Sequence, residues 1–189
     1  MTPPAPKGVL PSNVDQPRAR PVWRVTQSPW LIAALTFITF NLYAIWWLGR
    51  TWAQIKSEDG DANKRPVWHA LAMLVPIYGY LRFHAHMLAI DALAPRAVGL
   101  QPGAMTVAWI MVNAVDYVSS RPESPFWMLL VSSALGGALI GWAQHALNAT
   151  WTSLPGGAVP GQPHPLHWIL IALMSVVYLL AFVGSALPL

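Results

Sequence analysis

The 189-residue sequence contains no cysteine and few charged residues. The absence of cysteine excludes disulfide bonds, thiolate metal sites and lipid anchors attached to cysteine. Charged side chains make up 10% of the chain and only seven are Asp or Glu, so few groups are available for acid–base catalysis. Hydrophobic residues make up 55% of the chain, and tryptophan occurs 11 times. This composition predicts a membrane protein with several membrane helices rather than a soluble domain.

Recognisable catalytic motifs are also missing. The sequence has no HExxH zinc motif, no Gly-rich phosphate-binding loop, no Ser-His-Asp set in a familiar context and no paired carboxylates on one helix face. We therefore expect no enzymatic activity and no metal site. The net charge of +4 is small, and the basic residues flank apolar segments, as the positive-inside rule describes. We expect the lipid bilayer as a partner, and no nucleic acid.

The apolar residues form five segments after a proline-rich start. Residues 1–28 have no helical periodicity and predict an extended tail. Residues 29–189 predict one helical membrane domain, with segments at about 29–50, 66–94, 104–118, 125–151 and 166–187. In the first segment residues 30–49 carry no charged side chain, and about 20 apolar residues suffice to cross a bilayer. The expected fold is an all-α bundle of four or five membrane helices.

The basic residues indicate that one of the first two segments does not cross the membrane. Lys and Arg gather before residue 29 and between residues 50 and 65, and none follows Arg121. If all five segments crossed, the basic residues would be divided equally between the two sides, contrary to the positive-inside rule. A segment that returns to the side it entered from, or lies in the interface, removes this conflict. We expect such a re-entrant or interfacial element near the first linker.

Proline marks two further interruptions. Pro76 lies inside the second segment and predicts a kink or break in its helix. The Pro- and Gly-rich residues 153–165 predict a connector without regular structure.

A stripe of small residues predicts close helix packing. Ser133, Gly137 and Gly141 are spaced by four residues and therefore share one face of a helix. Small residues let two membrane helices approach closely, which favours their association. The sequence leaves open whether this face meets a helix of the same chain or of a partner.

Polar residues in the second and third segments are candidates for function. The set comprises Arg82, His84, His86, Asp91 and Asp116. Ionisable groups inside a membrane are rare and often functional, so these five residues could form a polar cluster that serves transport. His84 and His86 are two residues apart and point in different directions on a helix, so they cannot bind one metal ion together. Arg82 could pair with Asp91 or Asp116, or lie at the level of the lipid headgroups.

His145 is a candidate pigment ligand. It follows Gly141 by one helical turn, and a small residue at that position lets a flat tetrapyrrole approach an axial histidine. The alternative is a histidine near the end of a helix, where a cation is favourable. We expect no cofactor, with chlorophyll or haem as the alternative.

The residues from Thr39 to Trp52, TFNLYAIWWLGRTW, resemble the aromatic motif of a bacterial membrane family known as domain of unknown function 4234. The matching residues are Leu42, Tyr43, Trp46, Trp47, Arg50 and Trp52. Asn41 stands where that family usually has glycine. Gln144 and Asn148 resemble the family's later Q-x-x-x-N motif. The resemblance covers about residues 29–187 and implies a multi-pass protein of the bacterial inner membrane, but no particular activity.

Three functions follow from these features. The sequence favours a non-catalytic accessory or scaffolding subunit that packs against other membrane proteins. The first alternative is a transporter or channel for a small solute or ion, based on the polar cluster. The second alternative is a pigment-binding subunit, based on His145.

Overall fold

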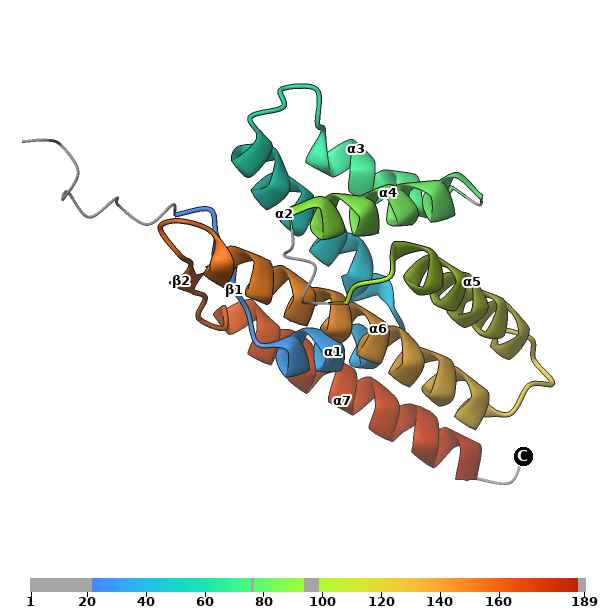
Figure 1. The fold of residues 1–189 in the computed structure, drawn as a ribbon. Coiled ribbons are helices and arrows are strands. Elements are labelled where there is room, and N and C mark those ends of the chain that lie inside the picture. Colours follow the sequence, from blue (N-terminus) through green and yellow to red (C-terminus); the bar gives the residue numbers. More distant parts are fainter. Residues whose placement is uncertain (1–21, 76, 94–98, 187–189) are drawn as a thin grey trace, which may run out of the picture.

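The computed structural model describes residues 22–75, 77–93 and 99–186 of the chain, and these residues are mostly helical (Figure 1). In chain order the elements are β1 (Val25–Thr26), α1 (Pro29–Ile38), α2 (Leu42–Asp59), α3 (Pro66–Leu71), the 3-10 helix η1 (Ala72–Leu74), α4 (Tyr78–Leu93), α5 (Pro102–Ser119), α6 (Phe126–Ser153), β2 (Val159–Pro160) and α7 (Pro165–Ala186). The predicted all-α fold is confirmed in this respect. Most of the predicted tail, residues 1–21, lies outside the described residues.

Two short strands join the start of the described chain to the connector before α7. β1 and β2 pair in parallel, with Val25 opposite Val159. The amides of Val159 and Gly161 donate to the carbonyls of Arg24 and Thr26, each at 2.8 Å. The prediction of a connector without regular structure was therefore wrong at these two residues. Pro160 fits this edge strand because the strand needs no donor from it.

The first predicted segment, residues 29–50, is not one continuous helix. α1 ends at Ile38 and α2 begins at Leu42, because Phe40 and Asn41 have left-handed backbones with φ of 51° and 68°. Asparagine adopts this conformation more readily than most residues. The side chain of Thr39 stabilises the break, since its hydroxyl donates to the Leu35 carbonyl and accepts from the Tyr43 amide at 3.0 Å.

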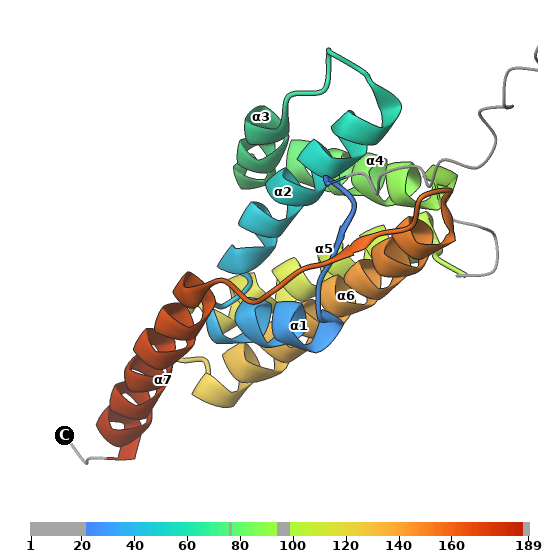
Figure 2. The ribbon, with the colours of Figure 1, turned by 90° about the vertical axis from the view of Figure 1, so that its left-hand side faces the viewer.

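α1 and α2 are the two arms of a hairpin. The chain enters α1 just after Arg24 and leaves α2 near Glu58, and these two side chains form an ion pair at 2.7 Å. Figure 2 shows the segment before α1 leading from the start of α1 toward α2. Both ends of the hairpin therefore lie at the same end of the molecule.

The second predicted segment, residues 66–94, is also broken and forms a second hairpin. α3 and η1 end at Leu74, and α4 begins at Tyr78 after Ile77, whose φ is 65°. Pro76 itself lies outside the described residues, but the helices on both sides of it confirm the predicted break. His69 of α3 and His86 of α4 lie side by side, with Nε2 and Nδ1 separated by 3.2 Å.

The remaining helices agree with the predicted segments. α5, α6 and α7 begin and end within two residues of segments 104–118, 125–151 and 166–187. Within the described residues one helix, α6, is both long and apolar enough to cross a membrane. Shorter apolar helical stretches are Pro29–Ile38, which is α1, and His167–Leu180 within α7.

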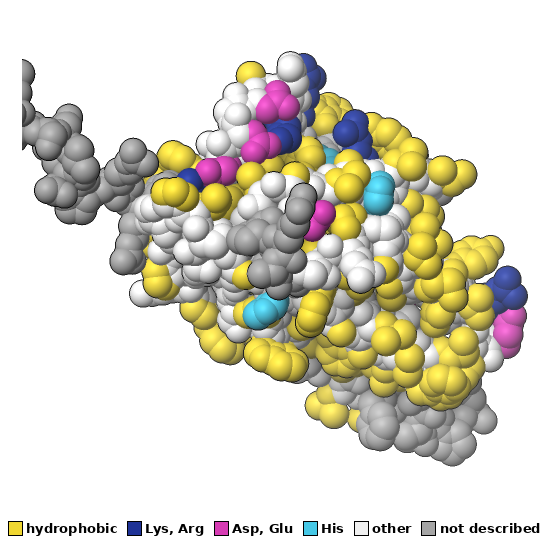
Figure 3. Space-filling model, in the orientation of Figure 1, with side chains coloured by type: hydrophobic (Ala, Val, Ile, Leu, Met, Phe, Trp, Pro, Cys, Tyr) yellow, Lys and Arg dark blue, Asp and Glu magenta, His cyan; other side chains and the backbone are white. Residues whose placement is uncertain are grey.

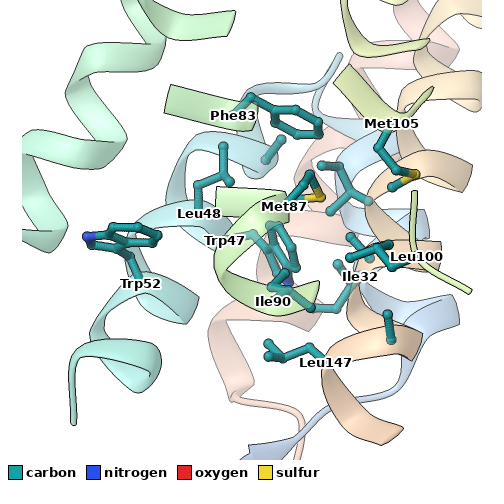
Figure 4. Packing of buried hydrophobic residues seen from close by; sticks show 14 of the residues in the cluster. Ile32, Trp47, Leu48, Trp52, Phe83, Met87, Ile90, Leu100, Met105 and Leu147 are labelled. Atoms are coloured by element: carbon teal, nitrogen blue, oxygen red, sulfur yellow. The ribbon is translucent and has the colours of Figure 1, made fainter. Parts of the chain in front are cut away.

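The core lies where α2 meets α4 and α6. In Figure 4, Trp47 lies among Leu48, Met87 and Ile90, whereas Trp52 lies apart from them on the α3 side. Trp47 is fully buried and is therefore a core residue. On the outside, hydrophobic side chains dominate the lower and right-hand parts of the face in Figure 3, and the few charged ones lie mainly at its upper end and its right edge.

Candidate functional site

The small-residue stripe of α6 packs against α1 of the same chain. A Cβ atom added to Gly137 would lie 2.6 Å from the Ala33 carbonyl oxygen, and one added to Gly141 would lie 3.0 Å from the Ala33 Cβ. Ser133, the first residue of the stripe, is fully buried. Backbone contact this close requires small residues at these positions. The sequence left open whether this stripe packs within the chain or against a partner. In the structure it packs within the chain.

Polar side chains converge where α1 gives way to α2. The Asn41 side chain rests on Gly136 and donates from Nδ2 to Oδ2 of Asp116 at 2.8 Å. The Ser132 hydroxyl donates to the other oxygen of the same carboxylate. Asn41 Oδ1 is buried without a partner. Asp116 thus joins the break in the first hairpin to α5 and α6.

A cavity of about 340 Å³ lies beside this group. Residues from both helix breaks line it, together with residues of α5; they include Phe40, Asn41, Leu42, Leu74, Val75, Gly79, Asn113 and Asp116. Broken helices that meet at a cavity are a feature of membrane transport sites. A carboxylate with amide neighbours could hold a proton or a small cation.

A second polar chain connects residues of both predicted family motifs. Trp47 Nε1 donates to Gln144 Oε1 at 2.6 Å, and Gln144 Nε2 donates to Asn148 Oδ1 at 2.7 Å. Asn148 then binds both backbone groups of Gln27, donating to its carbonyl at 2.6 Å and accepting from its amide at 3.1 Å. These contacts attach the segment before α1 to α6 and to the core tryptophan. The sequence indicated the residues but not their contact with one another.

Trp52, the last aromatic residue of the motif, packs against two histidines, His69 and His86. His69 was not identified from the sequence. The Trp52 ring stacks on His69, with centroids 4.0 Å apart. The Thr51 hydroxyl donates to the Trp47 carbonyl, so His86 Nε2, 3.0 Å from that hydroxyl, acts as the donor to it. His86 Nδ1 is then the acceptor for His69 Nε2. The sequence gave no signal of this pairing, because His69 is a single histidine on an apolar segment.

Three other motif residues, Tyr43, Trp46 and Arg50, lie on the side of α2 that faces α7. The Arg50 guanidinium lies over the Trp46 ring, 5.2 Å from its centroid. The Tyr43 hydroxyl lies 3.4 Å from Nε2 of His167 at the start of α7. These residues line a groove between the two helices.

The predicted polar cluster does not form. Arg82 binds the Tyr78 hydroxyl with its Nε at 2.8 Å, and His84 Nδ1 lies 3.0 Å from the Thr106 hydroxyl. The other three members lie apart: His86 is in the core, Asp91 is exposed, and Asp116 is at the first helix break. Successive residues of α4 point in different directions, about 100° apart, so they meet different neighbours.

His145 is exposed on α6, and its ring centroid lies 6.1 Å from that of Trp142. The face of Gly141 is occupied by α1, with the Pro29 carbonyl oxygen 3.1 Å from the position of an added Cβ. Beside this contact a pocket of about 310 Å³ remains, lined by Gly141, Trp142 and His145 among others. His145 as a pigment ligand therefore stays a prediction.

Comparison with protein-family models, with curated proteins and with solved structures gives no match for this chain. The resemblance to domain of unknown function 4234 therefore stays a prediction.

Proposed function

We propose that this chain is a non-catalytic membrane protein that serves as an accessory or scaffolding subunit and packs against other membrane proteins. In this proposal α5, α6 and α7 cross the bilayer, while the α1–α2 and α3–α4 hairpins enter it and return to the same side. The bacterial inner membrane is the compartment that the family resemblance implies.

The apolar exterior supports a membrane location. α6 has 28 residues, which gives a length of about 42 Å at 1.5 Å per residue, more than the roughly 30 Å of a hydrocarbon core. Its outward side chains include Trp127, Val131, Leu135 and Trp142, all between 46% and 61% exposed. Apolar surface of this extent is costly in water and favourable in lipid.

The charged residues near the two ends of α6 also support a position in which this helix crosses the bilayer. Arg24 and Glu58 lie beside Pro155, just after the end of α6, because Arg24 Nη1 donates to the Pro155 carbonyl at 2.7 Å. Arg121 and Glu123 lie just before the start of α6. The two groups are therefore separated by the length of the apolar helix.

The observation that carries the accessory role is the exposure of α7. This helix packs mainly against α1, and much of its circumference is free. Its exposed large hydrophobic residues are Trp168, Ile169, Leu173, Val176, Val177, Leu179, Leu180 and Val183. Figure 2 shows its C-terminal half extending away from the other helices. Such a helix is well suited to pack against a second membrane protein.

A photoreactive amino acid at position 176 tests the accessory role. We expect irradiation of native membranes to join Val176, which points outward, to one defined protein that also co-purifies in fixed proportion. The same probe at Ile171, which packs toward the core, is the control and should give no such adduct. Adducts with lipid only, together with a solitary purified particle, would contradict the accessory role.

The cavity beside Asp116 favours proton or small-cation passage as a second candidate function. A flux across liposomes containing the purified protein would support it, provided that Asp116→Asn reduces the flux at least tenfold. Asp91→Asn is the control, because Asp91 is exposed and far from the helix breaks in sequence. Equal flux in liposomes with and without the protein would exclude this function.

A further inference from the structure

A groove of about 750 Å³ runs between α2 and α7. Its walls are formed by successive turns of two helices, with Leu42, Trp46 and Arg50 on α2 and His167 and Leu170 on α7. Phe40 closes one end, where its ring stacks on Tyr178 with centroids 4.8 Å apart. Thr39 and Phe40 of the first helix break line this groove, but the core tryptophan Trp47 does not.

The lining changes from polar to apolar along the groove. Gln162, His164 and Arg50 line one end, and Leu42, Leu170 and Met174 line the part nearer Phe40. Leu42 and Arg50 are two turns apart on α2, which places them about 12 Å from each other along the helix axis. The groove therefore has a cationic, hydrogen-bonding end and an apolar end.

Two polar groups in the groove lack the partners that such groups usually have. Arg50 stacks on Trp46, but within the described residues it forms no ion pair with a carboxylate. His167 is 5% exposed, and its Nδ1 atom is buried without a hydrogen-bond partner. Its Nε2 faces the Tyr43 hydroxyl, so Nδ1 is the nitrogen left for a ligand. A buried polar atom without a partner is unfavourable, and a bound acceptor or donor would satisfy it.

We propose that this groove binds an anionic membrane lipid, with the phosphate at Arg50 and His167 and an acyl chain along Leu42, Leu170 and Met174. The guanidinium supplies charge-assisted hydrogen bonds to phosphate oxygens, and Trp46 holds it in place from the other side. The apolar half would contact nothing in a complex with free phosphate, so the lipid accounts for the whole groove. This inference rests on the proposed membrane location, which brings lipid to the groove.

The matched test uses two arginines that both stack on an aromatic ring. Arg50 lies over Trp46 in the groove, and Arg121 lies over Tyr117 at the other end of the molecule, 5.7 Å from its ring centroid. The full-length protein is purified in detergent, and binding of phosphatidylglycerol and phosphatidylcholine with identical acyl chains is followed by native mass spectrometry. We expect wild type to bind phosphatidylglycerol at least tenfold more tightly than phosphatidylcholine.

Arg50→Gln should remove this preference, lowering affinity for phosphatidylglycerol about tenfold, whereas Arg50→Lys should keep part of it and Arg121→Gln all of it. Leu170→Trp fills the apolar end and should weaken both lipids. The proposal would be overturned if the Arg50→Gln and Arg121→Gln variants preferred phosphatidylglycerol over phosphatidylcholine to the same degree. Displacement of the lipid by millimolar inorganic phosphate would overturn it as well, because a free anion would then be the ligand.

Membrane extraction with carbonate is measured on the same variants. Loss of the wild-type protein from the membrane fraction would overturn the proposed membrane location together with the lipid site. A protein that stays in the membrane but shows no lipid preference would overturn the lipid site alone.

Discussion

Arg24 and Glu58 form a two-pronged ion pair that closes the first hairpin. Arg24 Nε and Nη2 each donate to one carboxylate oxygen of Glu58 at 2.7 Å. The remaining guanidinium nitrogen of Arg24, Nη1, donates to the Pro155 carbonyl at the same distance. One arginine thus joins the segment before α1, the end of α2 and the connector after α6. The pair fixes both ends of the hairpin at one end of the molecule.

Removal of the Glu58 charge should destabilise the protein. Glu58→Gln leaves the largely buried Arg24 without its carboxylate, and we expect a loss of about 1–3 kcal/mol in the free energy of unfolding. Thermal unfolding in detergent at pH 7 measures it. Glu123→Gln is the control, because Glu123 is exposed at the opposite end of α6 and its loss should change the melting temperature little.

The same pair predicts how stability depends on pH. Hydrogen bonds from Arg24 are the main cause that lowers the pKa of Glu58 from its ordinary 4.5. A carboxyl whose pKa is lower in the folded state contributes stability above its unfolded pKa and loses it as pH falls through the folded value. The difference in melting temperature between wild type and Glu58→Gln should therefore be constant from pH 7 to about 5 and shrink below pH 4.5. A difference that stays unchanged down to pH 3 would contradict this cause.

Gly137 should not tolerate even one added carbon. Gly137→Ala places a Cβ 2.6 Å from the Ala33 carbonyl oxygen, so α1 has to move away from α6. We expect a loss of about 1–3 kcal/mol, measured as a lower unfolding temperature in detergent. Gly103→Ala is the matched control, since an added Cβ there meets nothing within 4 Å. Because alanine favours a helix over glycine, the control should be neutral or stabilising by up to about 1 kcal/mol.

Asn148 should control the order of the segment before α1. Asn148→Ala removes both hydrogen bonds to the Gln27 backbone, so β1 loses its attachment to α6. Amide exchange at Val159 and Gly161, which pair with β1, should become faster. Hydrogen–deuterium exchange followed by mass spectrometry of peptides covering these amides measures it. With Asn63→Ala, an exposed loop change, exchange there should match wild type.

The sequence predicts the helices of this protein better than the contacts between them. α5, α6 and α7 follow directly from apolar segments bounded by proline or polar turns. The break at Asn41 was harder to find, because an apolar run of sufficient length predicts a continuous helix. What stabilises the break is distant in sequence: Asp116 holds the Asn41 amide, and Gly136 leaves room for it.

In the candidate site, too, the sequence indicated residues better than the contacts between them. Trp47, Gln144 and Asn148 were identified from short motifs, yet their hydrogen-bonded chain depends on how α2 packs on α6. His69 was missed because its partner His86 lies beyond the second helix break. Polar residues that are neighbours in sequence were grouped into one cluster, but on a helix they point to different partners.

The most direct test of the account is the sidedness of four single-cysteine variants. The chain has no cysteine, so Val22→Cys, Ala62→Cys, Thr152→Cys and Glu123→Cys each carry one exposed thiol. Each variant is treated with an impermeant maleimide in right-side-out and inverted membrane vesicles. If both hairpins return to the side they enter from, positions 22, 62 and 152 react from one side and position 123 from the other. Reaction of positions 22 and 62 from opposite sides would contradict it, because residues 29–59 would then cross the membrane once.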